Sequence, residues 1–348
     1  MQTIYLSLVM GTEGSGVSTL LSEYGKRADM RTTLVVDPDR PADVGFTGAT
    51  GPEELTRFLH GLQSKRQTGA LGPFDRVVLA SGDLKAPSHL LSAITADPEL
   101  AASFRLDGIT LAVDVTGDAG ALMSSQRLLP ASAIADRIVL TKTDRQEPAA
   151  VKTLAGRLKA LNPPAPILRA RHGDIGPARL VDSGLFDPIT RSVDIDRWLC
   201  EAAYGWEANR RGANGNVPPL RRPITAEGLQ FFAATLDAPI GSTALAAFLK
   251  LLVALRGTSV LRLKGIIATA EQPDRPALID GTEHIMQPLL WLTRWPTADR
   301  RTRLVFVTTG ISEALITSLL RTLSDQPDPA RAAGAPAPSH ELPAGPAE

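Results

Sequence analysis

The sequence predicts an α/β protein, in which a mostly parallel sheet flanked by helices is followed by a smaller α+β domain. In the first half of the chain, short apolar runs alternate with segments of helical periodicity, which is typical of a parallel sheet with helices on both faces. In the second half, strand-like runs follow one another with only two helical segments, which indicates an antiparallel sheet.

The first domain is expected over residues 1–190. Its strands are predicted at 4–9, 33–36, 76–79, 108–113, 137–140 and 166–169, and its helices at 18–26, 53–63, 87–94, 120–128 and 147–161. In sheets of this kind, ligands bind at the carboxyl ends of the strands. The functional site is therefore expected where these apolar runs end.

A linker is expected over residues 191–224, because glycine, asparagine and proline leave no periodic signal in much of this stretch. The second domain is expected over 225–325, with strands at 229–236, 260–269, 277–279 and 303–308 and helices at 241–255 and 312–323. Residues 326–348 are rich in proline, alanine and glycine, and this composition predicts a disordered tail.

The composition excludes several classes of function. The 37 basic and 37 acidic residues cancel, so the chain has no basic surface excess for nucleic acid or an anionic membrane. Its single cysteine, Cys200, excludes an intrachain disulfide framework and fits a reducing compartment. With no apolar run of membrane-spanning length and no leader-like start, a soluble cytoplasmic protein is expected.

A glycine-rich segment, GTEGSGVSTL, follows the first predicted strand and opens the first helix. Its spacing is that of a phosphate-binding loop, in which backbone N–H groups surround a phosphate, a lysine contacts the outer phosphates and a hydroxyl binds magnesium. The lysine position is occupied by valine, so a phosphate cradle and a plain glycine-rich turn both remain open. The candidate nucleotide-binding residues here are Gly11, Gly14, Ser15, Gly16, Val17, Ser18 and Thr19.

A second motif, TKTD, ends the fifth predicted strand. It resembles the N-K-x-D motif, in which a carboxylate accepts hydrogen bonds from guanine and a lysine stem packs over the ring. Lys142 and Asp144 keep their positions, and Thr141 replaces the asparagine. All three are candidate nucleotide-binding residues.

Taken together, these segments resemble the CobW-like branch of the metal-insertion P-loop GTPases, which includes cobalamin-biosynthesis proteins and zinc-delivery chaperones. The resemblance rests on residues 96–114, 135–144, 161–175, 261–288 and 299–310. It implies a P-loop NTPase-type sheet with a CobW C-terminal domain, GTP or GDP with Mg²⁺ as ligand, and a metalloprotein or cobalamin-pathway client.

The sequence departs from the family pattern at several functional positions. Besides Val17 and Thr141, the family's E-x-x-G strand end reads Leu79, Ala80, Ser81, Gly82, and the cysteine-rich C-x-C-C motif is missing. Because phosphoryl transfer depends on charge neutralisation and positioning, these losses should lower hydrolysis more than binding. The resemblance therefore implies a metallochaperone-like GTP-binding protein with weak or absent GTPase activity.

Magnesium, if bound with nucleotide, is expected at Ser18 and Asp37, with Asp39 as the alternative. These aspartates could equally form a solvated pair in a proline-containing turn. Gly82 could donate its N–H to a γ-phosphate or merely begin a loop. Asp114 receives no catalytic role, because capping of a following helix explains it equally well.

Lys85 and Arg40 are candidate substitute cations, although surface placement explains both. The five histidines, His60, His89, His172, His284 and His340, show no ligand spacing with each other or with the cysteine. No tightly bound transition metal is therefore expected within one chain.

Two other functions stay open. The chain could be a non-enzymatic pseudo-GTPase adaptor, or a GTPase completed by a partner subunit or by a second copy in a homo-oligomer.

Overall fold

The computed structural model describes residues 3–27, 33–37, 51–117, 127–181, 195–199, 228–254, 259–283 and 285–324. The chain divides into two compact units, residues 2–203 and residues 204–348. Within the described segments, no helix is both long and apolar enough to cross a lipid bilayer.

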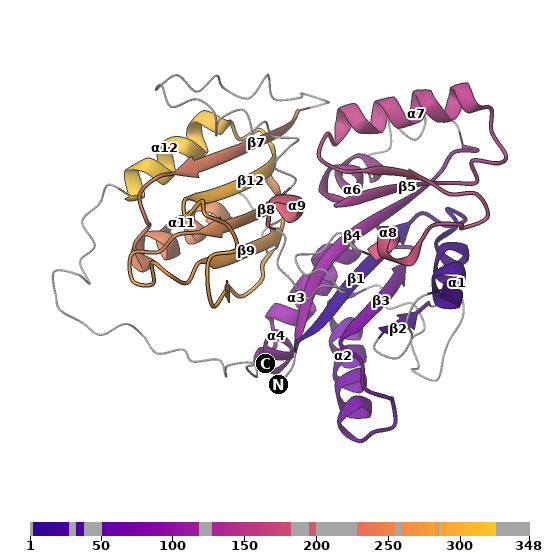
Figure 1. The fold of residues 1–348 in the computed structure, drawn as a ribbon, viewed down its shortest axis with the longest axis horizontal. Coiled ribbons are helices and arrows are strands. Elements are labelled where there is room, and N and C mark those ends of the chain that lie inside the picture. The colour runs from indigo at the N-terminus through magenta and orange to yellow at the C-terminus, as the bar shows by residue number, and fades with distance from the viewer. Residues whose placement is uncertain are drawn as a thin grey trace. The chain divides into compact units, whose positions relative to one another are not determined.

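The first unit is a six-stranded sheet flanked by helices (Figure 1). Its strands are β1 (Ile4–Gly11), β2 (Thr33–Val36), β3 (Arg76–Ser81), β4 (Phe104–Asp114), β5 (Arg137–Thr141) and β6 (Ile167–Arg169). Its described helices are α1 (Val17–Arg27), α2 (Pro52–Gln67), α3 (Ala86–Thr95), α4 (Pro98–Ser103), α6 (Leu128–Ile134), α7 (Pro148–Leu161), α8 (Pro177–Val181) and α9 (Ile195–Leu199).

All pairings in this sheet are parallel, and the strand order is β2-β3-β1-β4-β5-β6. The register places Met10 beside Ser81 and Gly11 beside Ala112, while Asp114 lies beside Thr141. The carboxyl ends of β1, β3, β4 and β5 therefore meet at one edge of the sheet. Ligands of open α/β sheets bind at this edge.

Buried apolar side chains fix α1 and α8 on one face of this sheet. The cluster contains Leu20, Leu21 and Tyr24 of α1 together with Val9, Val139 and Leu168 of the strands. A buried ion pair anchors the strands elsewhere, because Arg76 Nη1 donates to Asp107 Oδ2 at 2.9 Å and to Ser7 Oγ at 2.7 Å. These two hydrogen bonds from the Arg76 guanidinium group offset the free-energy cost of burying its charge.

The second unit is a mainly antiparallel sheet with two helices. Its described strands are β7 (Leu229–Leu236), β8 (Val260–Ile267), β9 (Ala277–Thr282), β10 (Ile285–Met286), β11 (Leu290–Trp291) and β12 (Thr302–Thr309). The helices are α11 (Ser242–Ala254) and α12 (Glu313–Ser324).

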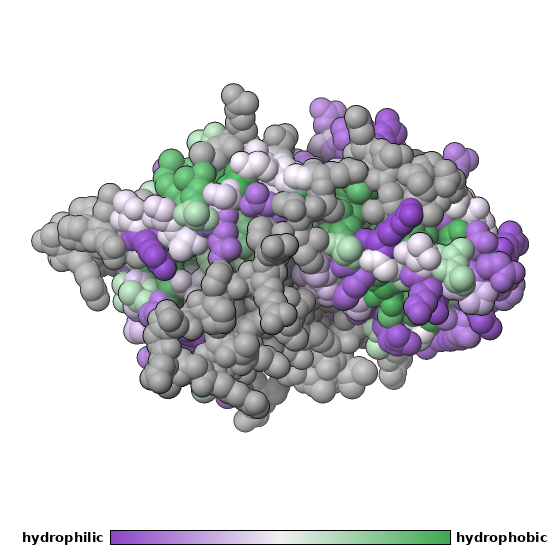
Figure 2. All heavy atoms as spheres, turned by 90° about the horizontal axis from the view of Figure 1, so that it is seen from above, coloured by the Kyte–Doolittle hydropathy of each residue, from purple (hydrophilic) through white to green (hydrophobic). Residues whose placement is uncertain are grey.

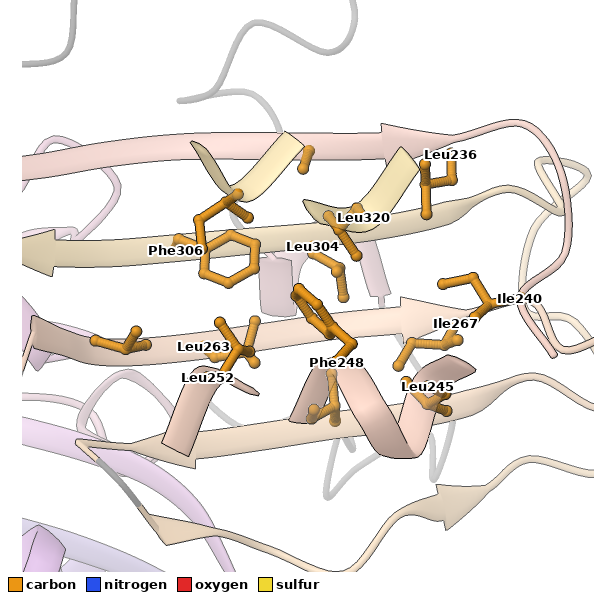
Figure 3. Packing of buried hydrophobic residues seen from close by; sticks show 14 of the residues in the cluster. Leu236, Ile240, Leu245, Phe248, Leu252, Leu263, Ile267, Leu304, Phe306 and Leu320 are labelled. Carbon is orange, nitrogen blue, oxygen red and sulfur yellow. The ribbon is translucent and has the colours of Figure 1, made fainter. Parts of the chain in front are cut away.

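One face of this second sheet forms a core with both helices. Figure 3 shows Phe248 of α11 projecting onto the sheet near Leu263, Leu304 and Phe306. The rings of Phe232 and Phe306 stack with centroids 5.1 Å apart. Burial of this apolar face against two helices gives the smaller α+β unit that the sequence predicts.

The surface of the described residues differs between elements. Leu251 and Val253 on α11 and Leu315 on α12 are exposed large hydrophobic residues of the second unit. Hydrophilic residues gather on the first unit at the right of Figure 2, and Lys152, Arg157 and Lys159 of α7 are exposed.

The predicted fold class is confirmed, and the structure corrects several details. β4 begins at Phe104 rather than at residue 108, because Phe104 and Leu106 are buried beside β1. The sequence did not predict α4, or the short strands β10 and β11 that pair with β9. Most of the predicted helix 120–128, the tail 326–348 and all of the linker 191–224 except α9 lie outside the described residues.

Candidate functional site

The glycine-rich loop lies between β1 and α1, where the order of strands reverses. Gly14 and Gly16 have positive φ angles of 73° and 87°, which only glycine adopts without strain. A Cβ on Gly11 would stand 2.2 Å from Ser15 Oγ and 2.9 Å from the carbonyl oxygen of Ala112. The backbone is thus packed as closely as a phosphate-binding loop requires, and α1 begins directly after it.

The side chains of this loop carry little that could neutralise a phosphate. Val17, in the lysine position, packs its side chain against the apolar cluster beneath α1, so only its backbone N–H is available to a ligand. Ser15 is buried, whereas Thr19 and Glu13 are exposed. Any phosphate held here would depend on backbone N–H groups and the helix dipole.

The two candidate magnesium ligands lie together. Ser18 Oγ donates to Asp37 Oδ1 at 3.3 Å, and Asp37 is buried. A hydroxyl and a carboxylate oxygen are hard ligands of the kind that Mg²⁺ takes beside a phosphate. The donor set therefore fits the ion expected with a nucleotide. Asp39 and Arg40 lie outside the described residues.

The end of β3 offers no charged side chain. Leu79, at the family's glutamate position, is buried in the sheet. Gly82 is exposed, and a Cβ added to it would meet no atom within 4 Å. The next residue, Asp83, contacts His89 Nδ1 at 3.1 Å, and Lys85 is exposed.

Thr141 connects the base-reading motif to the glycine-rich loop. Its Oγ1 donates to the backbone oxygen of Ser15 at 2.6 Å, and it also lies 3.2 Å from the oxygen of Val113. A threonine hydroxyl has one proton, so these carbonyls occupy the donor that the motif could otherwise offer a ligand. The structure therefore places Thr141 as a tether between two loops, which the sequence did not predict.

Lys142 has a partner that the sequence analysis missed. Its Nζ donates to Asp114 Oδ2 at 2.5 Å, while Asp114 Oδ1 accepts from the N–H and hydroxyl of Thr116. Partial burial works to raise the pKa of Asp114, but the bonds from Lys142 and Thr116 outweigh it and hold the pKa below its ordinary value. Asp114 is thus a positioning residue for the lysine.

Strained backbone gathers around Asp144. The described non-glycine residues with positive φ are Lys142, His172 and Glu283. Lys142 lies in the loop after β5 and His172 in the loop after β6. His172 Nε2 stands 3.6 Å from Asp144 Oδ2. Strain of this kind costs of order 1–3 kcal/mol and is retained chiefly where function requires it.

The loop that carries His172 also packs against α1. A Cβ on Gly173 would stand 2.9 Å from the backbone oxygen of Thr19, and Arg27 at the end of α1 pairs with Asp174. The phosphate-loop helix and the loop beside Asp144 are thus in direct contact. The strand order of a parallel sheet predicts that this loop lies near α1. The spacing of residues in the sequence does not identify which residues make the contact.

The metal-binding residues of the described chain are scattered. No group of three or more histidine, cysteine, aspartate or glutamate residues lies close enough together to hold a metal ion within the described segments. Cys200, His284 and His340 lie outside them. The expectation of no tight transition-metal site in one chain stays a prediction.

The parallel sheet, the cradle after β1 and the base-reading motif after β5 define a P-loop NTPase-type protein. The family model of the CobW/HypB/UreG nucleotide-binding domain matches residues 47–169, and that of the cobalamin synthesis protein CobW C-terminal domain matches residues 229–324. Together they match well over half of the chain. The chain belongs to the CobW-like family of P-loop GTPases.

Solved structures agree on the fold. One match is the crystal structure of the Zn(II)-bound YjiA GTPase from E. coli, which is 20% identical to this chain in sequence and has a TM-score of 0.59. The match covers 93% of this chain and 99% of the YjiA chain. A Zn(II)-bound triple mutant of YjiA is 19% identical and has the same TM-score. That match covers 93% of this chain and 100% of the mutant chain. No protein with a curated description matches the sequence significantly.

Proposed function

We propose that this protein binds GTP or GDP with Mg²⁺ and acts in metal homeostasis or cobalamin biosynthesis, with weak or absent intrinsic GTPase activity. The observation that carries this proposal is the tether from Thr141 to Ser15, because it joins a cradle of nucleotide-binding shape to a motif that keeps Lys142 and Asp144. A plain turn between a strand and a helix would need no such connection.

Slow turnover follows from the side chains at the phosphate end. Val17 is packed against the core and Leu79 is buried, so neither can stabilise charge in a transition state. Mg²⁺ held by Ser18 and Asp37 would neutralise part of the phosphate charge. The loss of charged contacts costs hydrolysis more than binding, because phosphoryl transfer depends on them almost entirely.

The role in metal handling rests on family membership and on the Zn(II) described for the YjiA structures. A metalloprotein or cobalamin-pathway client and a cytoplasmic location are part of the proposal. A pseudo-GTPase adaptor is the second candidate, supported by the apolar residues Val17 and Leu79 at the positions where the family carries charge.

Isothermal titration of the purified full chain with GTP, GDP and ATP, with and without Mg²⁺, tests the proposal. Guanine nucleotides are expected to bind and to be hydrolysed very slowly. Failure of every nucleotide to bind would favour the adaptor. Turnover at the rate of an ordinary chaperone GTPase, without a partner, would contradict the slow-hydrolysis claim, and metal analysis of the same sample tests for a retained transition metal.

A further inference from the structure

A hollow of about 280 Å³ opens beside β6, behind the loop that carries the base-reading motif. The residues that line it come from that loop, from the first turn of α7, from the end of β6 and from the loop that follows β6. They are Thr143, Pro148, Val151, Arg169, Arg171 and Asp174. None of these residues is among the candidate nucleotide ligands.

The two arginines of this hollow project from a rigid backbone. Ala170, between them, is buried, and its N–H donates to the oxygen of Leu140 at 2.8 Å. Its carbonyl oxygen accepts from both the N–H and the hydroxyl of Thr143. Arg169 is the last residue of β6 and Arg171 lies in the bend that follows it, and both residues line the same hollow.

The charge of the hollow is positive. Among the described residues, no hydrogen bond or ion pair engages the side chain of Arg169 or Arg171, whereas the one acidic residue of the lining, Asp174, pairs with Arg27.

The hollow is separate from the glycine-rich loop. Ala170 and Leu168 belong to the apolar cluster shared with α1 and α8, so α1 lies on the Ala170 side of the strand. The lining of the hollow includes Pro148 and Val151 of α7 and no residue of the glycine-rich loop, 11–19. An anion between the two arginines would not occupy the cradle that precedes α1.

We propose that this hollow is a second, independent anion site, which binds a small tetrahedral oxyanion of the phosphate class between Arg169 and Arg171. Two guanidinium groups can each donate paired hydrogen bonds to such an anion, and this geometry suits arginine better than lysine. The volume accommodates one phosphate with several waters, each of which takes about 30 Å³.

Calorimetric titration of the full chain with inorganic phosphate, at low ionic strength and without nucleotide, tests this proposal. Arg169→Gln and Arg171→Gln are each expected to weaken phosphate binding about tenfold, which is the loss of one charge-assisted contact. The double variant should show no binding at this site. Arg157→Gln, an exposed arginine of α7, is the matched control and should bind as the wild type does.

Thermal unfolding of each variant verifies that the fold is intact. Wild-type protein that binds no phosphate would overturn the proposal. So would phosphate that binds the double variant with wild-type affinity, because that anion would occupy the glycine-rich loop. Neither result depends on whether the chain binds guanine nucleotide, so the two proposals fail separately.

Discussion

The phosphate end and the base end of the candidate site differ in the side chains that they keep. The phosphate end, residues 11–19, keeps the backbone of a cradle and has valine in place of the family's cation, with Val17 packed against the apolar cluster. The base end, residues 141–144, keeps Lys142 and Asp144 and holds the lysine in place through Asp114. The comparison teaches that one end of a binding site can lose its charge and keep its backbone shape while the other end keeps its charged side chains.

This difference has an energetic consequence. Backbone N–H groups bind a phosphate without a counter-charge, and each charge-assisted bond contributes roughly 1.5–3 kcal/mol. Nucleotide affinity in this chain should therefore depend on the intact backbone at one end and on side-chain charge at the other. The predictions below separate the two contributions, from the largest expected effect to the smallest.

Gly11→Ala should break the phosphate end. The new Cβ would collide with Ser15 Oγ and approach the oxygen of Ala112, so the loop must shift. We expect GDP affinity to fall at least about a hundredfold, equivalent to losing two charge-assisted bonds, and stability to fall by about 1–3 kcal/mol. Gly82→Ala, where a Cβ meets open space, is the control for stability. Calorimetric binding unchanged in Gly11→Ala would show that the cradle does not hold phosphate.

Val17→Lys should repair the phosphate end. A lysine here would supply the missing cation, and we expect GDP to bind about tenfold more tightly, as one charge-assisted contact allows. Val17→Met has a long side chain without the charge and is the matched control. Equal affinities of the two variants would mean that the loop no longer presents this position to a phosphate.

Asp114→Asn should lower the stability of the fold at the base end by a smaller amount, and the loss should be largest at neutral pH. The folded-state pKa of Asp114 lies below its unfolded value, so its bonds stabilise the fold above that unfolded value, and the contribution disappears as pH falls through the folded pKa. We expect urea unfolding to show a loss of about 1 kcal/mol at pH 7 and a smaller loss at pH 3, where Asp114 is partly protonated in the unfolded chain. An equal loss at both pH values would contradict the pairing with Lys142.

Much of the fold could be predicted from the sequence because its signals are local. The alternation of apolar runs and helices identifies the parallel sheet, and the glycine spacing places the cradle after β1. Each of these depends on neighbouring residues, whose periodicity and conformational freedom can be read directly. The short strands β10 and β11 gave no such signal, because two residues carry no periodicity.

The contacts that define the candidate site could not be predicted in the same way. The bond from Thr141 to Ser15 joins residues 126 positions apart, and the pair of Lys142 with Asp114 spans 28. The sequence suggested that Asp114 caps a helix. Its second carboxylate oxygen does make a local bond, because it accepts from the N–H of Thr116 two residues ahead. Sequence spacing records local bonds of this kind, whereas bonds between strand ends emerge only from the order and register of the sheet.

The most direct test of the account is the ratio of GTP to ATP affinity in the wild type and in Asp144→Ala, measured by titration calorimetry with Mg²⁺. The carboxylate can accept two hydrogen bonds from guanine and finds no matching donors on adenine. We expect the wild type to prefer GTP by at least about tenfold, or about 1.4 kcal/mol, and the variant to lose this preference with its fold intact. Equal affinity of the wild type for both purines, or a preference unchanged by the substitution, would contradict the base-reading role of Asp144.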